Sequence, residues 1–281
     1  MSTETIGGLE SLAAEWRYVI TDMICRAGSG HLGGALSLVE IILTLYWRVM
    51  RVDPAHPAWD DRDRLVLSKG HGGPTLYTAL AYKGFFPARE LTTLNHNGTR
   101  LPSHCDMNQT AGVDMTTGSL GQGLSAATGM ALAGKMDRKD YRVFCVLGDG
   151  ESNEGQNWEA AMFAAHHHLD NLIGITDCNK LQIDGYTKDI VDMHPLAEKW
   201  RSFNWHVLEA DGHNIENLNH TFDQAIRLAG KPKMIIAHTL KGKGHPKFEN
   251  RVESHHIRVP DEETYRDLVE AVKIENFIWP Y

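Results

Sequence analysis

The sequence predicts an α/β protein, in which a doubly wound, mostly parallel sheet carries helices on both faces. Two short apolar runs, 143–147 and 172–176, are separated by a helical pattern over 153–167, the order typical of a strand–helix–strand unit. Further strand and helix patterns alternate before and after this unit. With 281 residues, 42% of them hydrophobic, the chain is long enough for a full core, and we expect one domain over residues 1–281.

Composition narrows the class of protein. A formal net charge of −8 argues against general nucleic-acid binding. No stretch of eighteen apolar residues is present, and the N-terminus lacks the basic and apolar regions of a signal peptide. The cysteines are scattered without a CxxC spacing, at positions 25, 105, 145 and 178. We therefore expect a reduced, cytoplasmic protein without a membrane span.

The first elements are two helices around a glycine-rich loop. Residues 9–26 have the apolar stripe of an amphipathic helix. Four glycines within 28–34 then predict a loop of wide backbone freedom that presents His31. A second helix is expected over 37–49, with Ser37 as its N-cap. A histidine in such a loop is more often solvent-exposed than catalytic.

A short strand over 65–67 leads through SKGHG into a helix over 74–82. A small polar loop that enters a helix N-terminus is a natural anion site, so His71 is a candidate site residue. The following segment, 95–117, has little periodicity and contains His104. Long irregular segments in compact domains tend to be functional.

A second glycine-rich loop, TTGSLGQG over 116–123, precedes a helix expected over 125–136. It could be taken for a dinucleotide-binding loop. The glycines at 118, 121 and 123 do not have the GxGxxG spacing, however, and this argues against a dinucleotide site.

The central unit carries the most informative pair of polar residues. Asp149 follows the first strand within Gly148-Asp149-Gly150, and Asn179 follows the second strand. Neighbouring parallel strands would bring both to the same sheet edge. Their oxygens suit Mg²⁺ or Ca²⁺ rather than zinc, with a diphosphate and water as further ligands. Flanking glycines permit close approach to a phosphate; the alternative is an ordinary turn and an ordinary Asn loop.

The last third repeats the alternation of strands and helices. Strands are expected over 204–209 and 233–238, with a helix over 214–229 between them. The basic segment TLKGKG, 239–244, is either a flexible solvated loop or a phosphate contact. A helix over 261–273 precedes an exposed-looking aromatic end, 277–281.

Taken together, these motifs resemble those of the transketolase family. GDG followed thirty residues later by Asn resembles the thiamine diphosphate fingerprint, and SGHLGG, SKGHG and TTGSLGQG are similar to motifs of the N-terminal half of transketolase. The resemblance covers nearly the whole chain. It implies thiamine diphosphate and Mg²⁺ (or Ca²⁺), with the metal held by Asp149, Asn179 and the Leu181 carbonyl. The residues that it implies at the cofactor are His71, Gly118, Ser119, Leu120, Gly148, Asp149, Gly150, Asn179 and Ile183.

The resemblance also implies catalytic residues, namely His31, His71, His104, Glu154 and His255. Glu154 would join an acidic relay towards the partner's catalytic glutamate, or else it is a helix N-terminal Glu stabilised by the helix dipole. His255 lacks the usual preceding tryptophan, which is Ser254 here, so a neighbouring histidine stays an alternative. Two other departures are Ser103 for glycine and Ser119 for proline.

The implied activity is transfer of a two-carbon ketol unit between sugars or sugar phosphates. The chain ends before the expected pyrimidine-binding domain, so the resemblance implies the N-terminal subunit of a split transketolase. It would self-associate and be active only as a heterotetramer with a C-terminal subunit. Alternatives are a subunit of a 2-oxoacid dehydrogenase or deoxyxylulose-phosphate synthase, or a non-catalytic thiamine diphosphate-binding protein. The histidines and TTGSLGQG favour transketolase.

Overall fold

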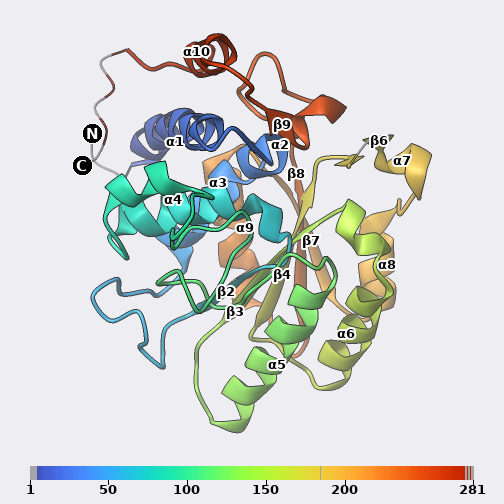
Figure 1. Cartoon of the computed structure of the whole chain (residues 1–281). Coiled ribbons are helices and arrows are strands. Elements are labelled where there is room, and N and C mark those ends of the chain that lie inside the picture. Colours follow the sequence, from blue (N-terminus) through green and yellow to red (C-terminus); the bar gives the residue numbers. More distant parts are fainter. Residues whose placement is uncertain (1–4, 184, 276, 278, 280–281) are drawn as a thin grey trace.

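The computed structural model describes residues 5–183, 185–275, 277 and 279. Within this part of the chain the main sheet has five strands in the order β2-β3-β4-β8-β7, and every neighbouring pair is parallel. The sheet, predicted as mostly parallel, is therefore parallel throughout (Figure 1). Its strands are β2 (Arg64–Leu67), β3 (Val143–Gly148), β4 (Leu172–Cys178), β7 (His206–Asp211) and β8 (Lys233–His238).

Helices cover both faces of the sheet, as predicted (Figure 1). One face packs against α1 (Ile6–Arg26), α3 (Val39–Thr44), α4 (Gly73–Lys83) and α9 (Ile215–Arg227), and the other against α5 (Gln122–Met136), α6 (Gly155–His166) and α8 (Leu196–Ser202). Alternate side chains of each strand point to opposite faces. In β3, Phe144 and Val146 enter the first core and Cys145 and Leu147 the second. The apolar run needs no polar positions because it is buried on both faces.

Shorter elements complete the described part of the chain. They are α2 (Leu32–Leu36), α7 (Thr187–Ile190), α10 (Glu262–Glu270), β5 (Leu181–Gln182), β6 (Gly185–Tyr186), a π-helical turn (Leu45–Val49) and 3₁₀ turns (Gly70–Gly72, Ala88–Thr93, Gly150–Asn153, Val252–Ser254). Strand β1 (Ser29–Gly30) pairs antiparallel with β9 (Ile257–Arg258). This pairing brings the late segment that carries His255 beside the early segment that carries His31. No helix of the described residues is long and apolar enough to cross a membrane.

The prediction for residues 28–49 is wrong in its boundaries. A helix begins at Leu32, and Ser37 closes that helix instead of opening the next one. Gly33 and Gly34 lie inside it because the packing there excludes side chains. A Cβ at Gly33 would lie 2.3 Å from Ser254 Oγ, and one at Gly34 would lie 2.9 Å from the His71 ring. These two glycines allow neighbouring side chains to pack closely against the helix, and they do not form the flexible loop that was predicted.

Two smaller expectations are also wrong. The sequence pattern places Met162 on the apolar face of the helix after β3, but Met162 is 55% exposed, and small alanines form the buried face of α6. The aromatic end is not simply exposed, since Phe277 and Trp279 lie 4.7 Å and 6.4 Å from the Tyr18 ring, between ring centres. The rest of that end, 278 and 280–281, lies outside the described residues.

Replacing Gly33 tests the packing role of the glycine pair. Helix propensity alone favours Gly33→Ala by about 1 kcal/mol, but the contact with Ser254 should reverse the sign and destabilise the protein by about 1–3 kcal/mol. Urea unfolding of the two proteins measures the difference. Gly129→Ala in α5, where a Cβ meets nothing within 4 Å, is the matched control and should be neutral or stabilising. Stabilisation by both changes would contradict the packing argument.

Candidate active site

A cavity of about 150 Å³ lies at the carboxyl edge of the sheet, where β3 and β4 end. Gly148, the last residue of β3, pairs with Asp177 of β4, so the segments that follow both strands lie side by side. The predicted site residues that line the cavity are His71, Leu120, Gly148, Asp149, Gly150, Glu154, Asn179, Leu181, Ile183 and His255. The parallel-strand argument that brought Asp149 and Asn179 to one edge is therefore confirmed.

Asp149 is a buried carboxylate held by backbone donors. Its Oδ1 accepts from Gly150 N at 2.9 Å and its Oδ2 from Lys180 N at 2.6 Å. Burial, followed by the charge of Asp177, raises the pKa of Asp149 to about 6. A cation placed beside this group would favour its charged form and lower that pKa.

Asn179 is oriented by two contacts. Its Oδ1 accepts from Leu181 N at 3.1 Å, and its Nδ2 donates to Asp177 Oδ2 at 3.1 Å. Asp149, Asn179 and Leu181 offer one carboxylate, one amide oxygen and one carbonyl, a donor set that fits Mg²⁺ or Ca²⁺. The described residues contain no cluster of three or more His, Cys, Asp or Glu side chains that could hold a metal. A cation here would therefore need ligands from a bound molecule and water.

The structure shows why residue 150 is a glycine. A Cβ at this position would lie 2.5 Å from the Gln182 Cβ, so the glycine is required by the packing of the β5 segment. A Cβ at Gly148 would make only ordinary contacts.

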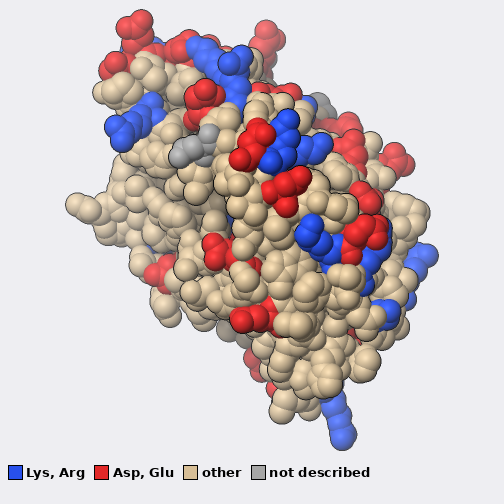
Figure 2. Space-filling model, turned by 90° about the vertical axis from the view of Figure 1, so that its right-hand side faces the viewer, with Lys and Arg blue, Asp and Glu red and all other residues tan. Residues whose placement is uncertain are grey.

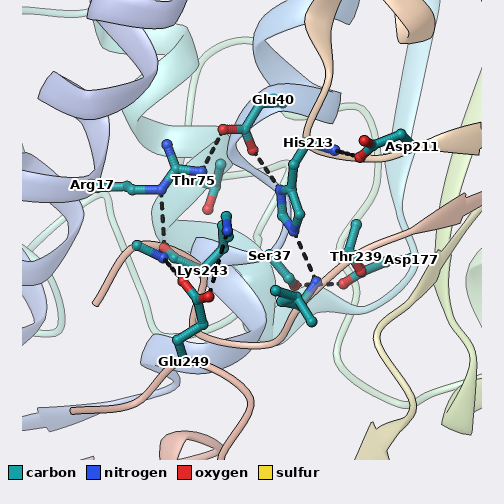
Figure 3. Close-up of polar contacts among 12 residues, drawn as sticks. Arg17, Ser37, Glu40, Thr75, Asp177, Asp211, His213, Thr239, Lys243 and Glu249 are labelled. Carbon is teal, nitrogen blue, oxygen red and sulfur yellow. Dashed lines mark hydrogen bonds and ion pairs between the residues drawn. The ribbon is translucent and has the colours of Figure 1, made fainter. Parts of the chain in front are cut away.

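Asp177, which we did not single out from the sequence, is the centre of the polar network below the cavity. The strand expected to end at Thr176 continues to Cys178, and Asp177 is fully buried within it. Its carboxylate accepts from Lys69 Nζ at 2.5 Å. It also accepts from the Ser37 hydroxyl at 2.6 Å and from the Thr239 hydroxyl (Figure 3). Burial alone would raise the pKa of Asp177, but the Lys69 ammonium holds it below its ordinary value.

Glu151 is a second buried carboxylate that the sequence did not reveal. It accepts from Gly121 N at 2.9 Å, from Gly148 N at 3.0 Å and from the Ser68 hydroxyl. It thus joins three loops that border the cavity. Burial raises the pKa of Glu151. The only signal for it in the sequence was its place directly after the GDG turn.

The basic segment 239–244 is not a flexible solvated loop. Thr239, Lys241 and Gly242 are buried, and Lys241 lines the cavity together with Lys69. Lys241 Nζ lies 3.1 Å from His255 Nδ1. Two buried ammonium groups at one cavity favour an anionic ligand, which was the phosphate alternative for this segment.

Several histidines gather around His31. Its ring centre lies 5.3 Å from that of His71, 5.5 Å from His104, 5.2 Å from His255 and 4.7 Å from His256. His256, the neighbour of the predicted His255, also belongs to the cluster. The cluster thus joins residues from four separate segments of the chain.

Burial keeps most of these rings neutral. It lowers the pKa of His31 to about 3 and, with the charge of Lys241 next, that of His255 to about 4. Burial, then the charge of Lys69, lowers the pKa of His71 well below its ordinary value, and burial also lowers that of His104. At neutral pH these rings can donate and accept hydrogen bonds without carrying charge.

Gly118 and Ser119 lie outside the lining of the cavity. Gly118 packs against His104, since a Cβ on its left-handed backbone (φ 149°) would lie 3.2 Å from that ring. Ser119 is exposed and accepts from Gln122 Nε2 at 3.2 Å. Glu154 does line the cavity, but it is exposed, and among the described residues its carboxylate has no hydrogen-bond partner.

The comparison with protein families gives one match. The family described as "Transketolase, thiamine diphosphate binding domain" matches residues 10–271.

Curated relatives of similar length match over most of the chain. A 6-deoxy-6-sulfo-D-fructose transketolase subunit of Clostridium sp. (strain MSTE9) is 55% identical over 246 residues, which are 88% of this chain and 90% of that protein. An apulose-4-phosphate transketolase subunit of Phocaeicola vulgatus is 39% identical and matches over 97% of this chain and 95% of its own length.

Solved transketolases share the fold but are longer. The transketolase from Campylobacter jejuni superposes with a TM-score of 0.85 at 31% identity, over 93% of this chain. This chain spans 42% of that protein's length.

Asp149→Asn should remove a pH-dependent loss of stability from the ligand-free protein. Because the folded pKa of about 6 lies above the ordinary value of 3.8, the charged carboxylate destabilises the fold increasingly as pH rises from about 4 to 6. The amide removes this penalty, but its NH₂ group cannot accept from one of the two backbone donors, Gly150 N or Lys180 N, and this loss lowers stability at every pH. The difference in the free energy of unfolding between variant and wild type should therefore shift in favour of the variant by on the order of 1–3 kcal/mol between pH 4 and pH 7. Urea unfolding of both proteins at the two pH values measures this shift.

The same variant should lose metal-dependent affinity for thiamine diphosphate in a calorimetric titration with Mg²⁺, because the bridging cation loses its only carboxylate ligand. Asp223→Asn, at an exposed position of α9, is the control and should alter neither property. Unchanged metal-dependent binding in Asp149→Asn would disprove the metal assignment.

Proposed function

This chain belongs to the transketolase family, and from that premise we propose that it is the N-terminal subunit of a two-chain transketolase. Such an enzyme transfers a two-carbon ketol unit between sugars or sugar phosphates. The observation that carries the proposal is the match to two relatives that are named as transketolase subunits, each over at least 90% of its own length. Longer transketolases contain an equivalent of this chain as less than half of their length.

The geometry supports thiamine diphosphate as the cofactor and Mg²⁺ (or Ca²⁺) as its metal. Asp149, Asn179 and the Leu181 carbonyl would hold the cation. Lys241 and His71 face the same cavity and would contact the diphosphate oxygens. When bound, thiamine diphosphate supplies the carbanion chemistry of ketol transfer, and the protein orients and tunes it.

The neutral histidines suit work on sugar hydroxyl groups. His31, His71, His104 and His255 each have a lowered pKa, so each presents one donor and one acceptor nitrogen at neutral pH. They would orient the donor sugar and move protons to and from its hydroxyl groups. Glu154, exposed and without a hydrogen-bond partner among the described residues, would extend this system towards the second subunit.

The relatives narrow the class of substrate. One is named for a sulfonated sugar and another for a phosphorylated one, so both names specify sugars with an anionic group. We propose the same substrate class for this chain, in cytoplasmic carbohydrate metabolism of the pentose phosphate type. No feature of the described residues favours a dehydrogenase-type or non-catalytic thiamine diphosphate protein, and the family match favours a transketolase over those alternatives.

A surface suited to subunit contacts is present. The side that carries α6, α7 and α8 in Figure 1 faces the viewer in Figure 2, where wide areas show neither acidic nor basic side chains. Met162, Phe163, Ile190 and Val191, from α6 and the α7 segment, are each at least 44% exposed. Exposed apolar surface of this kind marks interaction sites, and it supports self-association and binding of a C-terminal partner in a heterotetramer.

His71 and His104 should differ in their roles. His71 lines the cofactor cavity, whereas His104 does not. The ring of His104 lies beside that of His31, which in turn lies beside His71. His104→Ala should lower kcat/KM for the donor sugar by about 10²-fold and leave cofactor affinity nearly unchanged. His71→Ala should weaken cofactor binding by about tenfold and impair turnover as well. Steady-state kinetics with cofactor titration separates the two effects, and identical behaviour of the variants would show that one is misplaced.

The proposed function itself is tested by the requirement for a second polypeptide. The purified chain, saturated with thiamine diphosphate and Mg²⁺, should not transfer ketol units among a panel of sulfonated and phosphorylated sugars. Addition of the C-terminal subunit should restore transfer, because in this proposal that subunit would supply about half of the cofactor's contacts. Rapid turnover by this chain alone would overturn the two-chain assignment, and no turnover by the pair with any ketol donor would overturn the activity.

A further inference from the structure

Three largely buried polar residues outside the cavity meet beside the 239–244 segment. Arg17 comes from α1, Glu40 from α3, and His213 from the turn between β7 and α9 (Figure 3). Their side chains are only 7–13% exposed. Burying a charged pair is expensive unless its hydrogen bonds are satisfied, so this cluster calls for an explanation.

Glu40 lies at the centre of the cluster. Its Oε1 accepts from the Arg17 guanidinium, and its Oε2 lies 3.0 Å from His213 Nδ1. Burial alone would raise the pKa of Glu40. The hydrogen bond from His213 and the charge of Arg17 outweigh burial and hold that pKa below its ordinary value.

The backbone fixes the tautomer of His213. Leu240 N, which can only donate, lies 2.8 Å from His213 Nε2, so Nε2 must be the unprotonated nitrogen. Nδ1 therefore carries the proton and donates to Glu40. Glu40 thus keeps His213 in the tautomer that can accept from the backbone of Leu240.

Arg17 holds the other end of the same segment. Its Nε donates to Lys243 O at 2.9 Å, and its aliphatic part packs against Gly244. The two backbone contacts, at Leu240 and Lys243, flank Lys241 on both sides. The cluster of Arg17, Glu40 and His213 therefore fixes the chain around one buried lysine.

Lys241 is also held by backbone contacts of its own segment. Asn250 N donates to Lys241 O at 2.7 Å, and Gly242 N donates to Gly33 O at 3.0 Å. The cluster of Arg17, Glu40 and His213 adds to this support.

Lys241 is 2% exposed and shares the cavity with the Lys69 ammonium, which the Asp177 carboxylate already pairs. Like charges in a poorly solvated cavity repel strongly. A Lys241 backbone that was free to move would therefore let this ammonium turn away from Lys69 and out of the cavity.

We propose that Arg17, Glu40 and His213 are positioning residues, which fix the backbone on both sides of Lys241 and so hold its ammonium at the diphosphate of the cofactor. None of the three lines the cavity, and all three act through Lys241. The inference rests on the proposed function, because it takes thiamine diphosphate as the ligand.

A pair of substitutions at His213 separates positioning from general stability. His213→Gln places an amide near Nε2 and can still accept from Leu240 N, whereas His213→Asn places its amide near Nδ1 and leaves that donor unpaired. In the complex with Mg²⁺ and the C-terminal subunit, we expect His213→Asn to raise the calorimetric Kd of thiamine diphosphate by about tenfold and His213→Gln by less than about threefold. At saturating cofactor, kcat should stay within about twofold of wild type, since no reacting atom is touched.

A double-mutant cycle with Lys241→Met tests the route of the effect. If His213 acts through Lys241, His213→Asn should raise the Kd by less than about twofold when Lys241 is already replaced. Glu40→Gln, which keeps the size of the side chain, gives an independent variant if His213→Asn does not fold, and it should weaken cofactor binding in the same way. His220→Asn on the exposed side of α9 is the matched control and should leave the Kd unchanged.

The outcomes are distinguishable. A wild-type complex that binds no thiamine diphosphate overturns the proposed function and this inference with it. Two results in a wild-type complex that does bind would overturn only the positioning role. One is that His213→Asn and His213→Gln weaken cofactor binding equally. The other is that the effect of His213→Asn adds fully to that of Lys241→Met. The thermal midpoints of the ligand-free proteins identify any loss that comes from unfolding.

Discussion

The buried ion pair between Lys69 and Asp177 is the constraint around which the site is built. Both side chains are at most 2% exposed, and a charge left unpaired at that depth would destabilise the fold by several kcal/mol. The pair is tolerated because other donors complete the carboxylate: Ser37 at the end of α2, Asn179 after β4 and Thr239 after β8. Each donor comes from a different segment near the cavity, so one carboxylate holds these segments together.

The pKa values of the two aspartates at this edge, Asp149 and Asp177, are shifted in opposite directions, and this difference indicates different roles. Lys69 holds the pKa of Asp177 below its ordinary value, whereas burial and the nearby charge of Asp177 raise that of Asp149. Asp177 has its counter-ion within the protein. Asp149 has backbone donors and forms no ion pair with the described residues, and this leaves it as the group that gains most from a bound metal. The free-energy cost of burying the Asp149 carboxylate would thus be offset by a cation bound beside it.

The features that could be predicted from the sequence are those that depend on patterns of neighbouring residues. Apolar runs and glycine stops indicated the strands, and the geometry of parallel strands brought Asp149 and Asn179 together. Contacts between distant segments could not be predicted in this way. Nothing local relates Arg17 to Glu40, or Glu40 to His213, which is 173 positions further on. The prediction for Gly33 and Gly34 failed for the same reason, because the atoms that exclude their side chains belong to Ser254 and His71.

Two lysines, Lys69 and Lys241, give one end of the cavity a different ligand preference from the rest of the site. Lys69 and Lys241 make one end of the cavity suitable for phosphate oxygens, and their charges, after burial itself, help to lower the pKa of His71 and His255. A histidine whose folded pKa is lowered opposes protonation, so the stability that it contributes is complete above its unfolded pKa of about 6.5 and is lost as pH falls below that value. These histidines therefore stay neutral at neutral pH beside the two lysines. An anion is attracted to the lysines, and the imidazoles remain available for uncharged hydroxyl groups.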